Sequence, residues 1–227
     1  MKKTESKVEL GGLFYPTKDT SGNDIPFDNL FIPYIYREIY FEGVYVDILN
    51  GQKDMVIVDV GANIGITVDH FRKHAKRVIA VEPSSEHFTA LSKNKEFNKW
   101  DNVELYNVAL SDKDGEATLS HHAGNRTCNS ITNNYGGDTE TVETMAIDTL
   151  FEKAGIDEVD FMKFDPEGAE ELILYSDGFK KIAPKIKMIE CEFHHGDWQN
   201  LVNYLIGLGF KARRYESSAI IVLFTRE

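Results

Sequence analysis

VIVDVGANIG, residues 56–65, is a hydrophobic run that ends in a loop with two glycines. Val56 to Val60 has the composition of a buried strand, and helical spacing of apolar residues begins near Ile66. Glycine lets the intervening backbone turn sharply and approach a ligand, while free N–H groups at a helix start favour an anionic group. The stretch predicts a strand, a ligand-binding loop and a helix. The alternative interpretation is a glycine turn that packs the strand tightly against the helix and binds no ligand.

The alternation of short strands and helices continues towards the C-terminus. Such βαβ units form a mostly parallel sheet covered by helices on both faces. The end of the chain differs, because two strand-like runs over Lys211 to Tyr215 and Ala219 to Thr225 are separated by three residues and predict an antiparallel hairpin. Asp197 is a plausible N-cap. The expected strands are Val56 to Val60, Arg77 to Glu82, Val103 to Ala109, Val159 to Asp165 and Lys187 to Phe193. The expected helices are Ile66 to Lys73, Glu86 to Asn98, Ala169 to Leu174 and Trp198 to Leu208.

Two segments do not follow this rhythm. Residues 1–50 carry three prolines and many aromatic side chains, so we expect an N-terminal extension over the core of an α/β domain formed by residues 51–227. Gly124 to Gly137 is rich in Asn, Thr and Gly and is interpreted as a mobile excursion that could act as a lid. A short strand, Ala117 to Ser120, is expected before it, with His121 and His122 at the surface.

Composition limits the classes of partner. The formal net charge of −12 repels polyanions, so we expect no nucleic acid partner. Two distant cysteines, Cys128 and Cys191, form no zinc or redox motif. The first residues lack the apolar core of a signal peptide, and no run of eighteen apolar residues occurs. These observations predict a cytoplasmic protein without a membrane span.

A second anchor for a nucleoside follows the next expected strand. Glu82 ends that strand, where an acidic side chain can accept hydrogen bonds from both hydroxyls of a ribose. A dinucleotide-binding G-x-G-x-x-G pattern starting at Gly61 would need glycines where Asn63 and Ile66 stand. An NAD-dependent oxidoreductase is therefore the weaker interpretation.

Four motifs together resemble the FkbM family of methyltransferases, over roughly residues 40 to 210. They occur in order at expected strand ends: Asp59 to Gly65, Val81-Glu82-Pro83, Asn107 to Asp112 and Asp160 to Glu170. Pro166 departs from the family, which more often has a branched apolar residue there. The resemblance implies a Rossmann-like class I methyltransferase fold with a seven-stranded sheet, S-adenosyl-L-methionine as cofactor, and methylation of a hydroxyl on a sugar, polyketide or other small acceptor.

The resemblance also implies where the cofactor binds. The methionine end would lie at the first loop, the ribose at the end of the second strand, and the adenine beside the end of the third. The implied cofactor-binding residues are Asp59, Gly61, Ala62, Asn63, Gly65, Glu82, Pro83, Ser84, Asn107, Val108, Ala109 and Asp165.

Acidic residues gather where the fourth and fifth strands end. Asp165 and Glu167 share strand parity with Lys163, which we expect to pair with Asp59 or Glu190. A carboxylate here would complement a cationic sulfonium or accept a proton, and His194 is a further possible base. The candidate catalytic residues are Asp165, Glu167 and His194.

The sequence leaves several points open. Asp165, Glu167, Glu192 and His194 form an oxygen-rich set that suits magnesium or calcium, but their spacing fixes no geometry and no metal is assigned. Glu190 is expected to be a satisfied structural acid. The acceptor, whether sugar, lipid head group or peptide, and the oligomeric state are not predicted. A cofactor-binding module without turnover is the alternative from another class.

Overall fold

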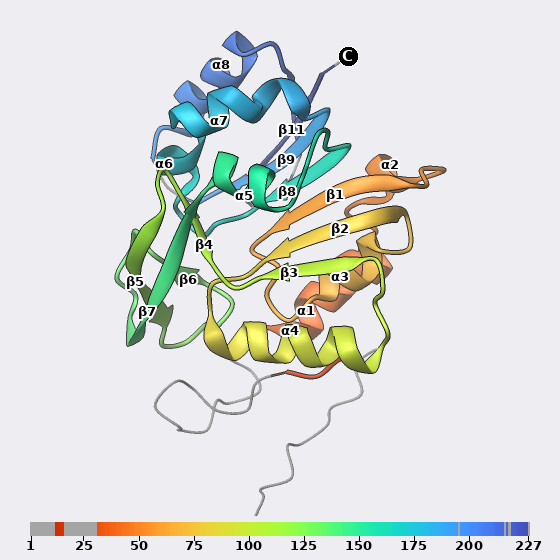
Figure 1. The fold of residues 1–227 in the computed structure, drawn as a ribbon, viewed down its shortest axis with the longest axis vertical. Coiled ribbons are helices and arrows are strands. Elements are labelled where there is room, and N and C mark those ends of the chain that lie inside the picture. Colours follow the sequence, from red (N-terminus) through yellow and green to blue (C-terminus); the bar gives the residue numbers. More distant parts are fainter. Residues whose placement is uncertain (1–11, 16–30, 195, 216, 218, 227) are drawn as a thin grey trace, which may run out of the picture.

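The computed structural model describes residues 12–15, 31–194, 196–215, 217 and 219–226 (Figure 1). Its centre is a seven-stranded sheet in the order β10-β11-β9-β8-β1-β2-β3. The strands from β9 to β3 pair in parallel, and β11 is antiparallel to both β9 and β10. This confirms the predicted sheet and its C-terminal hairpin, although residues 216 and 218 of the hairpin turn lie outside the described residues. The strands are β1 Met55–Val60, β2 Ala75–Val81, β3 Val103–Tyr106, β8 Phe161–Phe164, β9 Met188–Phe193, β10 Lys211–Arg214 and β11 Ile220–Thr225.

Helices cover both faces of this sheet, as its parallel strands require. On β1, Val58 and Val60 join the hydrophobic cluster under α5 to α8, whereas Ile57 joins the cluster under α3 and α4. Both faces are thus buried, which explains the unbroken hydrophobic run in this strand. The Asp197 side chain accepts from the N–H of Asn200 and caps α8, as predicted. The helices are α3 Ile66–Phe71, α4 Ser85–Phe97, α5 Ile147–Lys153, α6 Glu170–Leu174, α7 Asp177–Ile182, the 3-10 helix Ala183–Lys185 and α8 Trp198–Gly207.

The described part of the N-terminal segment packs on the α3 side of the sheet. It contains α1 Ile32–Arg37, a π-helix Glu38–Glu42 and α2 Val46–Leu49. The ring of Tyr45 meets those of Phe71 and Phe161 edge to face, with centroids 4.8 and 6.1 Å apart. This segment therefore shares the core, while residues 1–11 and 16–30 of the expected extension lie outside the described residues.

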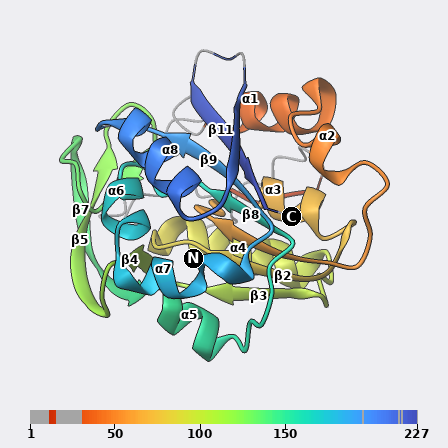
Figure 2. The same ribbon diagram turned by 90° about the horizontal axis from the view of Figure 1, so that it is seen from above.

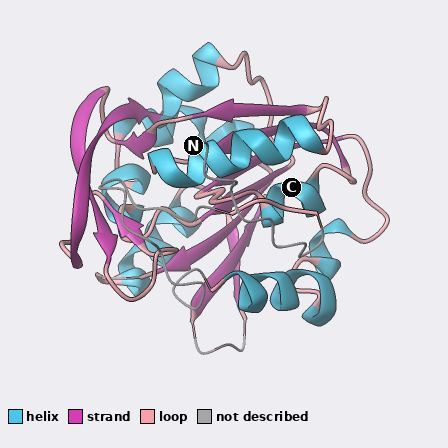
Figure 3. Cartoon of the chain, turned by 90° about the horizontal axis from the view of Figure 1, so that it is seen from below, coloured by secondary structure: helices cyan, strands magenta, loops and turns pink. Residues whose placement is uncertain are grey.

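A second sheet of four strands, in the order β4-β7-β5-β6, stands beside the central sheet (Figures 2 and 3). Its strands are β4 Ala109–Ser111, β5 Gly115–His122, β6 Asn129–Ser130 and β7 Gly136–Ala146. The expected single strand Val103 to Ala109 is wrong, because the chain leaves the central sheet after Tyr106 and pairs Ala109 with Thr144 of β7. The supposed excursion contains β6. His121 is fully buried rather than exposed, and its ring contacts Asn129 of β6 and Glu140 of β7.

Among the described residues, no helix combines the length and the apolarity needed to cross a lipid bilayer.

Candidate active site

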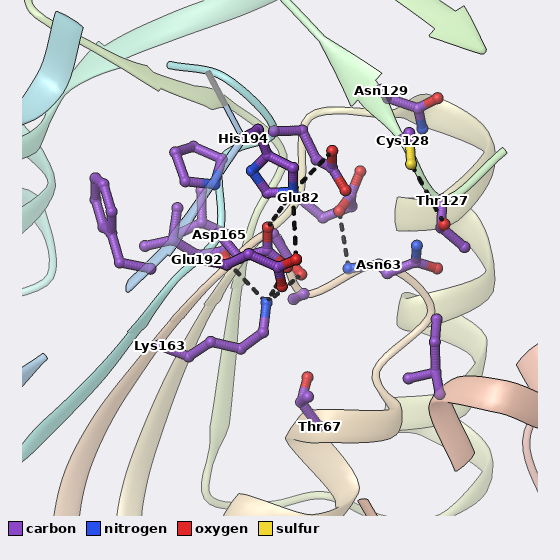
Figure 4. Close-up of a pocket in the computed structure, with 18 of the residues that line it drawn as sticks. Asn63, Thr67, Glu82, Thr127, Cys128, Asn129, Lys163, Asp165, Glu192 and His194 are labelled. Atoms are coloured by element: carbon purple, nitrogen blue, oxygen red, sulfur yellow. Dashed lines mark hydrogen bonds and ion pairs between the residues drawn. The ribbon is translucent and has the colours of Figure 1, made fainter. Parts of the chain in front are cut away.

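A cavity of about 860 Å³ lies where the parallel strands end (Figure 4). Its wall combines the loops after β1 and β2, the ends of β8 and β9, the N-terminal segment and the four-stranded sheet. Ligands of open α/β sheets bind at this edge because the loops after the strands diverge there. The structure brings ten of the predicted site residues into the wall: Gly61, Ala62, Asn63, Glu82, Pro83, Val108, Ala109, Asp165, Glu167 and His194.

The loop after β1 is held by its own backbone. The N–H groups of Gly61 and Ala62 both donate to the carbonyl oxygen of Val81 at 3.0 Å, and that of Gly65 donates to Ala62 at 2.9 Å. Gly61 has a left-handed φ of 77°, and a Cβ atom there would collide with the backbone oxygen of Asp165. Glycine at this position is therefore required by the contact between two loops, and these N–H groups fix the loop's shape rather than standing free.

Glu82 is the buried acid at the end of β2, with 4% of its surface exposed. One carboxylate oxygen accepts from the N–H of Asn63 at 2.8 Å and the other from the N–H of Ser84 at 2.9 Å. A carboxylate offers about four acceptor positions, so roughly half of its capacity remains. Glu82 is thus fixed in orientation by the protein and still able to accept hydrogen bonds from a ligand.

A chain of buried polar side chains joins this region to the four-stranded sheet. Glu140 accepts from Nε2 of His121 at 3.1 Å, and Nδ1 of His121 lies 3.0 Å from Oδ1 of Asn129. Nδ2 of Asn129 then contacts Nδ1 of His87 at 3.2 Å, and this nitrogen lies 3.8 Å from Glu82. Burial lowers the pKa of His121, but the hydrogen bond to Glu140 outweighs it and raises the net value. The second sheet is therefore linked side chain by side chain to the nucleoside anchor.

Four predicted cofactor residues lie behind the cavity wall rather than in it. Asp59 is fully buried and accepts from the hydroxyl of Thr67. A Cβ atom on Gly65 would press on the side chains of Leu91 and Trp100. The remaining two hold neighbouring loops, because the Ser84 hydroxyl caps α4 and the Asn107 amide donates to two backbone oxygens after β2. The residues concerned are Asp59, Gly65, Ser84 and Asn107.

Lys163 is the buried cation beneath the cavity floor. Its ammonium lies 2.9 Å from Oδ2 of Asp165 and 3.9 Å from Oδ1 of Asp59. Burial alone would lower the pKa of Lys163, but the charges of Asp165 and Asp59 raise it well above its ordinary value. The expected partner Asp59 is therefore the more distant one, and Lys163 chiefly fixes one oxygen of Asp165.

Carboxylates surround His194 at the other end of the cavity. Nδ1 of His194 lies 2.8 Å from Glu170, a carboxylate with 2% of its side chain exposed. Nε2 lies 3.3 Å from Oε2 of Glu167, 3.6 Å from Oδ1 of Asp165 and 3.7 Å from Oε1 of Glu192. Glu167 follows β8 with a positive φ of 52°, next to Gly168. The structure thus brings together all three candidate catalytic residues around one ring nitrogen.

Crowding of these acids changes their pKa values. Burial, and then the charge of Asp165, raises the pKa of Glu167 to about 8. The same two causes raise the pKa of Glu192. Burial lowers the pKa of His194, but the hydrogen bond to Glu170 and the charges of Asp165 and Glu167 raise it to about 9. His194 is therefore a cation at neutral pH in this arrangement and holds the neighbouring carboxylates.

Glu190 differs from the satisfied acid that the sequence suggested. It is 5% exposed, and its Oε2 has no hydrogen-bond partner among the described residues. Burial raises its pKa to about 7 against the opposing effect of Lys163. The charge of Lys163 and a hydrogen bond from Tyr45 still favour its ionised form, so Glu190 is partly rather than fully satisfied.

Sequence reasoning missed the residues that the N-terminal segment and the second sheet add to the wall. Neither region follows the βαβ pattern that located the other residues, and the Asn-rich composition before β7 was the one available signal. The missed wall residues include Glu38, Ile39, Tyr45, Leu119, Thr127, Cys128, Asn129 and Ile131, and in addition His87 of the predicted helix α4.

Solved structures share this arrangement. The FkbM methyltransferase of Methylobacillus flagellatus KT superposes with a TM-score of 0.58 over 84% of the chain and 47% of its own, at 17% identity. An rRNA methylase from Streptococcus thermophilus gives a TM-score of 0.52 over 84% of the chain and 96% of its own, at 14% identity. At these identities the likeness shows the fold alone.

Sequence comparison gives the family. A curated relative, the AMB antimetabolite synthetase AmbE of Pseudomonas aeruginosa, is 33% identical over 102 residues, which is 43% of this chain and 5% of that protein. The chain therefore spans a small fraction of this relative's length. The family model of the methyltransferase FkbM domain matches residues 59–215, which include all the strand-end motifs described above. The chain belongs to the FkbM methyltransferase family, whose cofactor is S-adenosyl-L-methionine.

Proposed function

We propose that the chain transfers a methyl group to a hydroxyl of a small molecule or sugar. The observation that carries this proposal is a single cavity with two chemically different ends. Glu82 lines one end, with acceptor capacity left for a nucleoside, and Asp165 and Glu167 line the other. A methyl transfer to oxygen needs both a bound cofactor and a group that receives the hydroxyl proton.

The end of the cavity at β1 and β2 fits S-adenosylmethionine. Glu82 is oriented by two backbone N–H groups and retains positions for the two hydroxyls of a ribose. Val108 to Leu110 add a buried, mainly apolar wall against which an adenine can pack. When bound, the cofactor supplies a methyl group on a positively charged sulfur, and the carboxylate of Asp165 complements that charge.

The acid-lined end would receive the acceptor. As the new C–O bond forms and the C–S bond breaks, the hydroxyl proton must pass to a nearby base. Oδ1 of Asp165 and Oε2 of Glu167 have no hydrogen-bond partner among the described residues, so they are available for that proton. Asp165 is our first candidate, followed by Glu167. His194 would serve as a base only above about pH 9, where its ring is neutral, and Glu170 orients that ring.

The proposed acceptor is small rather than a nucleic acid. The net charge of −12 opposes binding of a polyanion, and carboxylates at the acceptor end would repel phosphates. The rRNA methylase shares the fold, which does not determine the acceptor. We also place the chain in the cytoplasm, because Cys128 and Cys191 are both free thiols.

Isothermal titration with S-adenosylmethionine, S-adenosylhomocysteine and NAD tests the cofactor site. We expect saturable binding of the first two and none of NAD. Glu82→Ala should weaken both by about 100-fold or more, because hydrogen bonds to a charged group contribute roughly 1.5–3 kcal/mol each. Glu143→Ala, which removes an exposed carboxylate from β7, is the matched control and should bind normally.

Other outcomes separate the competing functions. Binding of NAD alone would replace the proposal by a nicotinamide-dependent oxidoreductase. Cofactor binding that depends on Glu82, with no methyl transfer to any of a panel of sugars and hydroxylated small molecules, would favour a binding module without turnover. A methylated product whose formation requires Asp165 supports the proposal, and mass spectrometry of the product locates the new methyl group.

A further inference from the structure

Three potential metal-ligand atoms converge at the acceptor end of the cavity. One carboxylate oxygen of Asp165, one of Glu167 and a ring nitrogen of His194 all lie within 4.8 Å of one another. Oδ1 of Asp165 and Oε2 of Glu167 are both buried, and neither has a hydrogen-bond partner among the described residues. Buried carboxylate oxygens without a hydrogen bond cost free energy unless a cation or another ligand completes them, and the His194 nitrogen that faces both lies 3.6 and 3.3 Å away. Their convergence on one point indicates the position of that ligand.

The spacing suits a divalent cation. Nε2 of His194 lies 3.3 Å from Glu167 and 3.6 Å from Asp165. Adjacent ligands of an octahedral cation with bonds of about 2.1 Å are roughly 3 Å apart, so small rotations of these side chains would close the shell. The three residues come from two neighbouring strand ends, namely the loop after β8 and the residue after β9.

The surroundings of the three atoms also match those of metal ligands. Glu170 contacts Nδ1 of His194 at 2.8 Å, which orients Nε2 towards the two carboxylates. A carboxylate behind a histidine is the usual outer support of a metal-bound imidazole. Lys163 occupies Oδ2 of Asp165 and leaves Oδ1 to face His194. Glu170 and Lys163 thus orient the three potential ligands from outside, which is a second observation in favour of a metal site.

We propose that Asp165, Glu167 and His194 form a site for a divalent cation of the Mg²⁺ or Mn²⁺ class, completed by water or by the acceptor. Two carboxylate oxygens and one imidazole suit these cations. The sequence alone assigned no metal, because only the fold shows that the three atoms converge. The inference rests on the proposed function in one respect: a cation here would bind the acceptor's hydroxyl oxygen and make it more acidic.

Titration of the full chain with Mn²⁺, followed by electron paramagnetic resonance and calorimetry, tests the site. We expect one saturable site per chain, with affinity reduced at least about 10-fold by Glu167→Gln or by His194→Gln. Glu42→Gln removes a carboxylate from the cavity rim outside the set and should bind Mn²⁺ like the wild type. Mg²⁺ should compete for the same site.

Two results would overturn the inference: no saturable Mn²⁺ binding, or binding that both variants retain. Either result would mean that protonated His194 pairs with the carboxylates instead. Thermal unfolding shows whether each variant is folded, and a variant that fails leaves the other to decide. S-adenosylhomocysteine is titrated separately. If S-adenosylhomocysteine binds and Mn²⁺ does not, the metal site is wrong and the proposed function stands. If Mn²⁺ binds and S-adenosylhomocysteine does not, the metal site stands and the proposed function is wrong.

Discussion

The two ends of the cavity treat their buried charges in opposite ways. At the β2 end, both oxygens of Glu82 accept backbone hydrogen bonds. At the β8 and β9 end, Asp165, Glu167 and Glu190 each keep a buried oxygen without a hydrogen-bond partner among the described residues. A buried carboxylate with hydrogen bonds to the backbone is held in one orientation and can bind a ligand with its remaining acceptor positions. A buried carboxylate oxygen without a hydrogen bond raises the free energy of the folded state, and a ligand or a proton can complete it.

The contrast is not complete, because Nε2 of His87 at the β2 end also lacks a hydrogen-bond partner among the described residues. Its ring is nonetheless fixed through Nδ1 by Asn129. The difference therefore concerns carboxylates in the cavity wall: backbone hydrogen bonds complete Glu82, whereas three carboxylates beside the proposed acceptor site each keep an oxygen without one. Behind the wall, Asp59 also has a buried oxygen without a hydrogen bond among the described residues. This arrangement locates binding at one end and chemistry at the other.

The largest expected effect lies where the two ends touch. Gly61→Ala would force a Cβ atom against the backbone oxygen of Asp165 at a φ of 77°. Left-handed strain costs about 1–2 kcal/mol and overpacking about 1–3 kcal/mol, so we expect a loss of about 2–5 kcal/mol in urea unfolding. Gly155 has a φ of 57° and no neighbour within 4 Å of a built Cβ atom, so Gly155→Ala should lose only the stability that left-handed backbone strain costs. Equal losses of stability in the two variants would show that the loop at Gly61 is not in tight contact with the backbone of Asp165.

A stabilising change at the acidic end is the second prediction. The pKa of Glu190 is about 7 instead of 4.5, so ionising it destabilises the folded state. Stability conferred by the protonated form is complete below about pH 4.5 and is lost as pH rises through about 7. Glu190→Gln should therefore be more stable than the wild type above pH 7, by about 2–3 kcal/mol, and no different at pH 4.

Urea unfolding at several pH values measures this difference. Glu143→Gln on the exposed face of β7 is the matched control, and its stability relative to the wild type should not change with pH. If Glu190→Gln proves less stable at pH 8, Glu190 has a partner that neutralises it, and the contrast between the two ends fails.

The sequence predicted the parts of the site that depend on local pattern. Strand alternation placed Asp165, Glu167 and His194 on one side of neighbouring strand ends, and the structure brings them within ion-pair distance. Helical and strand periodicity also gave the central sheet, because each βαβ unit is decided within about thirty residues. Local rules therefore suffice where partners are fixed by consecutive elements.

Non-local pairing accounts for what was missed. The second sheet joins Ala109 to Thr144, a contact that no local pattern specifies. The His121 ring is likewise held within that sheet, since it contacts Asn129 of β6 and Glu140 of β7. The choice of Asp165 over Asp59 as the close partner of Lys163 depends on side-chain geometry beneath the cavity, which strand parity leaves open.

The smallest expected effect tests the link between the second sheet and the nucleoside anchor. Asn129→Leu would leave Nδ1 of both His87 and His121 without their present partner, and it should destabilise the fold by about 1–2 kcal/mol. Because the His87 ring stands 3.8 Å from Glu82, we also expect S-adenosylhomocysteine to bind a few-fold more weakly by calorimetry. Asn134→Leu, at an exposed turn of the same sheet, should change neither quantity much. Unchanged affinity in Asn129→Leu would mean that the second sheet only covers the cavity, and that the order at the β2 end comes from the backbone around Glu82 alone.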